Sequence, residues 1–193
     1  MGLALSSIGL YGGAFDPPHV GHVAVVRSAK EELDVDRLVV LVSERPGHKD
    51  VHLPVEARLE LVRAAFPDDE VRLDPYPRTI DLLRAEDFDD PLFVVGADQF
   101  CDFLSWKEPE AVLELARLAV ATRPGFPRER LDTVVARLGR PERVVFFEIP
   151  PIPVASREIR TLAAAGAPLD GLVPDGVAEL IRRHGWYAAD RRP

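Results

Sequence analysis

Short apolar runs alternate with stretches of helical spacing along most of this chain, and this alternation constrains its fold more than any other feature. Each run has four or five residues, which suits a strand buried on both faces of a sheet. The runs cover residues 8–11, 38–42, 92–95, 118–121 and 144–147. Because strands that alternate with helices are joined by right-handed crossovers, the pattern predicts a parallel sheet with helices on both sides.

The segments between these runs carry apolar residues three and four positions apart, as helices do. Helices are predicted over residues 20–33, 54–65, 108–115, 128–138, 156–165 and 174–183. Loops are predicted over 45–50 and 74–77, where proline and glycine interrupt both patterns. The prediction is an α/β fold, a Rossmann-like doubly wound parallel sheet with a C-terminal helical cap from about residue 151, in a single domain spanning residues 1–193. Ligands of such sheets bind beyond the carboxyl ends of the strands.

Charge and composition narrow the partners and the compartment. With 193 residues and 47% hydrophobic content, the chain is long enough to bury a sizeable core. Its 32 acidic and 24 basic residues give a net charge of -8, which disfavours a nucleic acid partner. The single Cys101 cannot form an internal disulfide, and no apolar run approaches membrane-spanning length. We therefore expect a cytoplasmic protein that binds neither nucleic acid nor membrane.

The segment from Gly12 to His22, Gly-Gly-Ala-Phe-Asp-Pro-Pro-His-Val-Gly-His, directly follows the first predicted strand. Gly12 and Gly13 are expected to let the backbone approach a ligand and to supply positive φ. Pro17 and Pro18 suit the first turn of a helix that starts here. Unpaired N–H groups at that helix start would attract an anion.

The two histidines of this segment, His19 and His22, are three positions apart and share one helical face, so both can reach the same phosphate. Two other interpretations stay open, a glycine-rich turn with incidental histidines and a metal site whose third ligand the sequence does not identify. Asp16 could orient a histidine or cap the helix, and we favour the structural role.

The whole segment resembles the GxFDPxHxGH signature of the nucleotidyltransferase family within the class I synthetase-like α/β folds. The resemblance implies that His19 and His22 are catalytic residues that contact the phosphates of ATP. It also implies that Gly12, Gly13 and Phe15 belong to the ATP site.

A second series of residues resembles nicotinate-nucleotide adenylyltransferases. It consists of Gly96 and Asp98, then Trp106, then Arg123-Pro124-Gly125. The resemblance implies that Gly96 and Asp98 lie near the adenosine and that Trp106 and Arg123 serve the acceptor, with the tryptophan stacked on its pyridine ring. Without the resemblance, a tryptophan of this kind is more commonly a core residue.

Three further features match the same family. Residues 46–49, Pro-Gly-His-Lys, resemble its Pro-x-His-Lys loop, which implies that Lys49 meets phosphate as a third catalytic residue, although a loop lysine is usually just solvated. Arg58 matches an arginine of the family on the following helix, but an exposed helical arginine needs no function. Thr79 corresponds to the threonine of the SYT-x-D-TL element that touches the nicotinate nucleotide, or it simply begins a helix. Arg78 stands at the tyrosine position of that element.

Residues 154–160, Val-Ala-Ser-Arg-Glu-Ile-Arg, resemble the ISSTxIR signature of the family. The resemblance implies that Ser156 and Arg160 bind ATP, and a guanidinium can clamp the triphosphate through two hydrogen bonds. Ser156 could instead cap a helix. Ala155 and Arg157 depart from the signature, and Arg157 could supply substitute charge.

The reaction implied by the resemblance joins ATP to nicotinate mononucleotide and gives deamido-NAD and pyrophosphate, a step of NAD biosynthesis. Such a transfer needs no protein nucleophile, since the acceptor phosphate attacks the α-phosphorus directly. Mg²⁺ is expected to arrive with ATP and to need little from protein carboxylates, and no protein metal ligands are predicted. The alternatives are nicotinamide mononucleotide or another small acceptor, or a non-catalytic nucleotide-binding module, which the departures at Arg78, Ala155 and Arg157 motivate. Assembly of several copies of the chain is left open.

Overall fold

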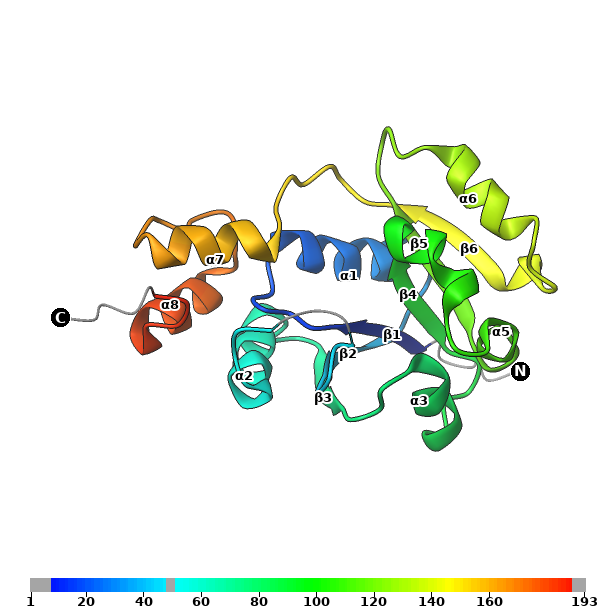
Figure 1. Cartoon of the computed structure of the whole chain (residues 1–193), viewed down its shortest axis with the longest axis horizontal. Coiled ribbons are helices and arrows are strands. Elements are labelled where there is room, and N and C mark those ends of the chain that lie inside the picture. Colours follow the sequence, from blue (N-terminus) through cyan, green and yellow to red (C-terminus); the bar gives the residue numbers. More distant parts are fainter. Residues whose placement is uncertain (1–7, 48–50, 189–193) are drawn as a thin grey trace.

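The structure is a computed structural model that describes residues 8–47 and 51–188. Six strands form one parallel sheet with the order β3-β2-β1-β4-β5-β6 (Figure 1). The strands are β1 (Ile8–Gly13), β2 (Arg37–Ser43), β3 (Glu70–Asp74), β4 (Leu92–Gly96), β5 (Arg117–Thr122) and β6 (Val144–Glu148). This is the strand order of a doubly wound α/β sheet, so the predicted fold is confirmed.

The two edge strands differ from the sequence prediction. β3 was missed, because its Glu-Val-Arg-Leu-Asp sequence alternates polar and apolar residues and does not read as an apolar run. Its last residue, Asp74, was assigned to a loop but pairs with Ser43 of β2. β6 was expected to be buried on both faces, and most of its residues are only half-buried. Both differences have one cause, since an edge strand has a neighbour on one side only and is less completely covered.

The predicted helices are confirmed with small changes at their ends. The helices are α1 (Val20–Glu32), α2 (Val55–Ala65), α3 (Thr79–Ala85), α4 (Ala97–Cys101), α5 (Pro109–Leu115), α6 (Arg128–Val135), α7 (Ser156–Ala164) and α8 (Asp175–His184). Two 3₁₀ turns, η1 (Phe103–Ser105) and η2 (Pro141–Arg143), precede α5 and β6. Within the described ranges, no helix is both long and apolar enough to cross a membrane.

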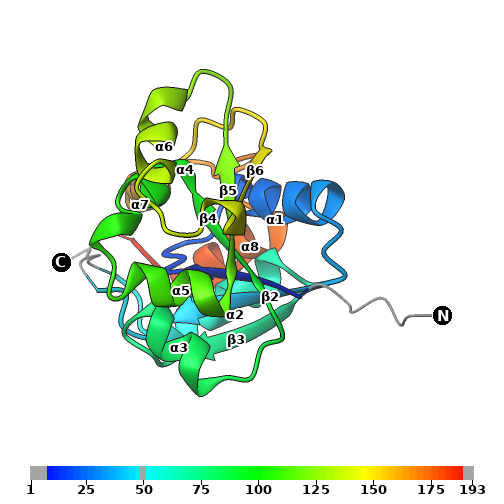
Figure 2. The ribbon, with the colours of Figure 1, turned by 90° about the vertical axis from the view of Figure 1, so that its right-hand side faces the viewer.

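The sheet divides the apolar core into two clusters because alternate side chains of a strand point to opposite faces. In β1, Tyr11 belongs to the cluster under α1, α2 and α8, whereas Leu10 belongs to the cluster under α3, α5 and α6. Figure 2 shows α1 and α5 on opposite sides of the sheet. Both faces of the central strands are therefore covered, as their apolar runs predicted.

The two C-terminal helices lie beyond the carboxyl end of β1, at the left of Figure 1. Ile159 of α7 and Val177 and Ile181 of α8 join the cluster that α1 and α2 share. The backbone N–H of Val20, at the start of α1, donates to the carbonyl oxygen of Leu172 at 3.1 Å. The C-terminal cap is thus packed against the segment that carries the histidine motif.

One arginine inside the core ties three segments together. Arg58 of α2 was expected to be exposed, but only 1% of its surface is accessible. Its guanidinium donates to the carbonyl oxygens of Ala14 and Ser43, both at 2.8 Å, and to that of Leu53 at 3.2 Å. Helical spacing assigns a residue to one face of its helix, but it does not show that carbonyl groups from other segments lie against that face. Arg58 therefore fixes the loop after β1 relative to the end of β2.

We expect Arg58→Ala to lower the free energy of unfolding by about 3 kcal/mol or more, since it leaves several buried carbonyl groups without a donor. The matched control is Arg63→Ala on the same helix, where the side chain is exposed and the expected change is within about 0.5 kcal/mol. Urea unfolding followed by circular dichroism measures both. Equal effects of the two substitutions would contradict the tethering role of Arg58.

Candidate active site

Two adjoining cavities open at the carboxyl ends of β1 and β4, where the strand order of the sheet reverses. The larger has a volume of about 1190 Å³ and the smaller about 540 Å³. Gly12, Gly13, Ala14 and Gln99 line both cavities. A ligand in one cavity can therefore meet a ligand in the other across the end of β1.

The glycines at this junction act differently from the prediction. Gly12 and Gly13 are the last residues of β1, and neither has positive φ; the left-handed residue is Phe15, with φ 50°. A Cβ on Gly13 would lie 2.8 Å from the ring of Phe15, which is itself buried. Gly13 is therefore required because the Phe15 ring folds back over it, and both glycines leave bare backbone at the cavity wall.

The helix after the motif begins at the predicted residue, Val20, but the two prolines lie outside it. Pro17 and Pro18 precede α1, and the N-cap is His19, so the prolines are not in its first turn. The expected free N–H groups are also partly used, because the N–H of Val20 is bonded to Leu172 and that of His22 to the carbonyl oxygen of His19 at 2.9 Å. Two of the backbone N–H groups at this helix start are therefore already bonded within the protein.

The imidazole of His22 lines the larger cavity. Its Nδ1 accepts a hydrogen bond from the backbone N–H of His19 at 3.1 Å. A neutral imidazole whose Nδ1 accepts carries its proton on Nε2. His22 is thus held in the tautomer that can donate a hydrogen bond to an oxygen anion.

The ring of His19 lies behind that of His22, with ring centroids 3.7 Å apart and planes inclined by 26°. Only 9% of His19 is exposed, it lines neither cavity, and its Nδ1 has no partner among the described residues. A Cβ at Gly21 would approach that Nδ1 to 3.0 Å, so the glycine makes room for the ring. Burial lowers the pKa of His19 to about 4, and the ring is neutral at pH 7.

Asp16 does not cap α1, whose N-cap is His19, and its contacts give it a structural role of another kind. Its carboxylate accepts hydrogen bonds from the backbone N–H of His52 at 2.6 Å and from the hydroxyl of Tyr187 at 2.7 Å. Burial, together with the hydrogen bond and charge of Asp16, raises the pKa of Tyr187, so its hydroxyl stays protonated and remains a donor. One buried carboxylate therefore joins the motif to the loop before α2 and to the end of the chain.

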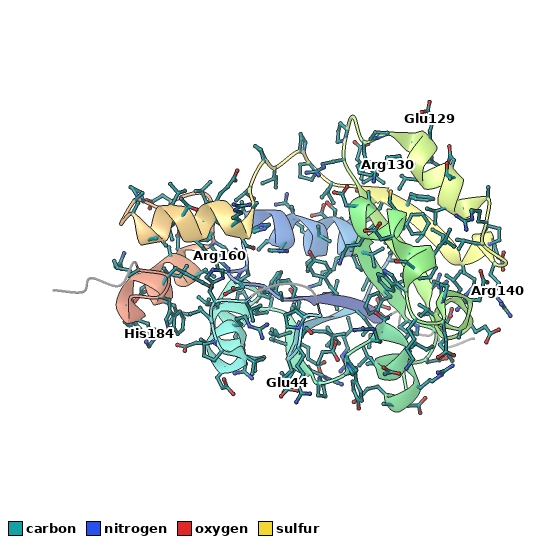
Figure 3. All side chains as sticks on the ribbon, in the orientation of Figure 1. Glu44, Glu129, Arg130, Arg140, Arg160 and His184 are labelled. Atoms are coloured by element: carbon teal, nitrogen blue, oxygen red, sulfur yellow. The ribbon has the colours of Figure 1, made fainter. Side chains whose placement is uncertain are left out.

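Residues of α7 complete the wall of the larger cavity. Ser156, Arg157 and Arg160 line it, and Figure 3 shows Arg160 between α7 and α2. The Ser156 hydroxyl donates to the carbonyl oxygen of Pro17 at 2.9 Å and does not cap the helix. Arg160 donates to the carbonyl oxygen of Asp16 at 2.7 Å. Both residues therefore hold the motif in place at the cavity wall.

The smaller cavity contains two of the predicted acceptor residues, Thr79 and Trp106. Thr79 is the first residue of α3, so it both begins a helix and lines the cavity. The indole of Trp106 packs edge-on against Phe103 and Phe93, with ring centroids 5.3 and 6.4 Å apart. It is only half-buried, so it is a cavity wall as well as part of the core.

Three predicted residues, Gly96, Asp98 and Arg123, are not among the described residues that line either cavity. Asp98 and Arg123 are close to each other, with 3.5 Å between Nη2 and Oδ2, at the ends of neighbouring strands. The side chain that lines both cavities from this region is Gln99, which sequence reasoning missed. Its position directly after Asp98 at the end of an apolar run was the available signal. Lys49 lies outside the described residues.

No group of three or more histidine, cysteine, aspartate or glutamate side chains in the described ranges could hold a metal ion.

Residues 10–162 match the model of a protein family described as cytidylyltransferase-like. This match covers most of the chain and includes β1 through α7. The fold and the histidine motif therefore define a nucleotidyltransferase.

Curated relatives define the family more closely. A protein of Rubrobacter xylanophilus is 36% identical over 200 residues, covering 96% of this chain and 94% of its own. A protein of Thermus thermophilus is 37% identical over 192 residues, covering 93% and 98%. Both carry the name "Probable nicotinate-nucleotide adenylyltransferase". The chain belongs to the nicotinate-nucleotide adenylyltransferase family.

Solved structures agree on the fold. The nicotinic acid mononucleotide adenylyltransferase of Plasmodium falciparum complexed with APC superposes with a TM-score of 0.75 at 16% identity, covering 94% of this chain and 97% of that one. The same protein complexed with NaAD gives a TM-score of 0.74 at 18% identity.

The buried His19 predicts a loss of stability in acid. Its pKa is about 4 in the folded protein and 6.5 ordinarily, so between these values the unfolded chain takes up a proton that the folded chain does not. The contribution of the neutral His19 to the free energy of unfolding is therefore fully present above pH 6.5, and it is lost as the pH falls toward 4. Between pH 7 and pH 5 this one group is expected to lower the free energy of unfolding by about 2 kcal/mol.

The measurement is urea unfolding of the wild type and of His19→Gln at pH 7 and pH 5. All other groups titrate in both proteins, so the difference between the two pH dependences isolates His19. Identical pH dependences would show that the imidazole is not buried in its neutral form.

Proposed function

We propose that this chain transfers the adenylyl group of ATP to nicotinate mononucleotide, giving deamido-NAD and pyrophosphate in NAD biosynthesis. The observation that carries the proposal is the meeting of two cavities at Gly12 and Gly13. One cavity has the side chains that suit a triphosphate, and the other has an aromatic wall that suits a pyridine ring. The names of the relatives support the choice of substrates.

ATP is assigned to the larger cavity. Its wall carries Arg157, Arg160 and the imidazole of His22, which are donors for phosphate oxygens. Glycine at positions 12 and 13 lets a polyphosphate approach the backbone closely. Among the described residues that line this cavity, Asp16 is the one acidic residue. Its carboxylate already accepts hydrogen bonds from Tyr187 and His52.

The acceptor is assigned to the smaller cavity, with its pyridine ring on Trp106 and its phosphate directed toward Gly12 and Gly13. An oxygen of that phosphate attacks the α-phosphorus of ATP, a new P–O bond forms, and the bond to the β-phosphate oxygen breaks as pyrophosphate leaves. Charge develops on the α-phosphate and on the leaving group. His22 donates to the α-phosphate, and Arg157 and Arg160 stabilise the departing pyrophosphate. Lys49 is proposed to meet phosphate from the loop before α2.

Mg²⁺ is proposed to arrive bound to ATP and to neutralise phosphate charge. Asp16 is already hydrogen-bonded to two protein donors, so phosphate oxygens and water are the suitable ligands for the ion. We further propose that the chain works as one domain in the cytoplasm.

Nicotinamide mononucleotide is a second candidate acceptor, because it differs from nicotinate mononucleotide only by an amide in place of a carboxylate. A non-catalytic nucleotide-binding module is the alternative of another class. The deciding experiment measures pyrophosphate release from ATP and Mg²⁺ with nicotinate mononucleotide, nicotinamide mononucleotide and phosphopantetheine in parallel. Preference for nicotinate mononucleotide supports the proposal. Preference for another acceptor keeps adenylyl transfer but changes the assigned acceptor. No release with any of the three supports the non-catalytic binding module.

His22→Ala is expected to lower kcat about 100-fold or more, which is typical of removing one donor from a charge-stabilising site. The melting temperature should stay near that of the wild type, since His22 lies at a cavity wall. Steady-state kinetics and thermal unfolding test this pair of expectations. An unchanged kcat would remove His22 from the mechanism.

Trp106→Ala is expected to raise the KM of the acceptor about tenfold and to leave the KM of ATP unchanged, because the indole faces the acceptor cavity alone. Trp106→Phe keeps an aromatic wall and should recover part of the loss. A rise in the KM of ATP alone would reverse the assignment of the two cavities.

A further inference from the structure

One wall of the smaller cavity is built from the start of α3 and from Trp106 and Lys107. Two ion pairs join α3 to the segment 107–108. Lys107 Nζ lies 2.7 Å from Asp81 Oδ1. Arg84 holds both carboxylate oxygens of Glu108, at 3.0 and 2.6 Å. Arg78, the N-cap of α3, and Trp106 are therefore fixed on the same cavity wall.

The cations that line this cavity differ in the carboxylates that neutralise them. Lys107 is paired with Asp81, and Arg45 has Glu44 at 3.9 Å. Arg78 has no carboxylate within ion-pair distance in the described ranges, and its Nη1 donates a hydrogen bond to the adjacent carbonyl oxygen of Pro77 at 2.8 Å. Its side chain is exposed to the cavity, so most of a guanidinium fork is available to a ligand.

A guanidinium beside an aromatic ring wall matches a particular ligand chemistry. A planar ring can lie on the indole, and a carboxylate on that ring can accept two parallel hydrogen bonds from the fork. A carboxamide offers only one acceptor oxygen. Its NH₂ group is a donor, so it cannot accept a hydrogen bond from the guanidinium. The pair Arg78 and Trp106 therefore discriminates between an aromatic acid and the corresponding amide.

We propose that Arg78 is the specificity-determining residue that binds the carboxylate on the pyridine ring of the acceptor and selects nicotinate over nicotinamide mononucleotide. The inference rests on the proposed function and deepens it. Arg78 occupies a position where the resembling family motif has tyrosine, so this chain places a full positive charge there.

The phosphate of the acceptor is the other anion that Arg78 could contact. That phosphate must reach the α-phosphorus of ATP, so it belongs at Gly12 and Gly13, which line both cavities. Arg78 and Trp106 line the smaller cavity but not the larger one. The ring end of the acceptor, with its carboxylate, is therefore the end that Arg78 meets.

The test compares kcat/KM for the two mononucleotides in the wild type, Arg78→Gln and Arg78→Lys. Arg78→Gln is expected to lower the value for nicotinate mononucleotide about 10- to 100-fold and to change that for nicotinamide mononucleotide less than about threefold. Arg78→Lys keeps the charge without the fork and should lie between. The matched control is Arg182→Gln on α8, which removes an exposed arginine that lines neither cavity and should change neither value.

Equal losses with both acceptors would show that Arg78 binds a part common to them, such as the phosphate, and would overturn the inference. Unchanged values with both would overturn it as well.

Calorimetric titration of each mononucleotide without ATP separates this inference from the proposed function. Weaker binding of nicotinate mononucleotide alone to Arg78→Gln supports the role of Arg78 even if the wild type releases no pyrophosphate, a result that would refute only the adenylyl transfer. Equal affinity of the wild type for the two mononucleotides would overturn the role of Arg78, whatever the turnover.

Discussion

The reversal of strand order between β1 and β4 is the constraint on which the site depends. The chain leaves β1 toward α1 on one face of the sheet and leaves β4 toward α4, which packs on the other face. Connections that diverge in this way leave a crevice at the carboxyl ends of the two strands. The bare backbone of Gly12 and Gly13 and the side chain of Gln99 lie there, and the crevice continues as one cavity on each side.

The loop after β1 is held in this crevice by donors from distant parts of the chain. Its carbonyl oxygens accept hydrogen bonds from Arg58 of α2 and from Ser156 and Arg160 of α7. The Asp16 carboxylate binds the backbone of His52 and the hydroxyl of Tyr187. Polar groups buried in a loop must be satisfied in this way, because no helix or sheet ladder is available to them. Helix α7 is consequently part of the wall of the larger cavity and not a separate appendage.

The two histidines of the motif have different environments although they are only three residues apart. His22 reaches the larger cavity with its Nδ1 fixed by a backbone donor, whereas His19 is packed behind it and kept neutral by burial. The stacked rings make His19 a support for the orientation of His22. A spacing of three residues predicts that both side chains point the same way, but it does not predict which one covers the other.

The sequence by itself determined five of the six strands in the described ranges, six of the eight α-helices and the edge of the sheet where the cavities open, because apolar periodicity and interruption by glycine and proline are local properties. The sequence analysis did not predict edge strand β3, because an edge strand is covered less completely and its sequence alternates polar and apolar residues. Only the tertiary structure decided that Arg58 is buried, that Phe15 and not a glycine takes positive φ, and that Gln99 lines the cavities while Asp98 pairs with Arg123. These outcomes depend on carbonyl groups, rings and charges brought together from segments far apart in the chain, and a local pattern contains no information about such partners.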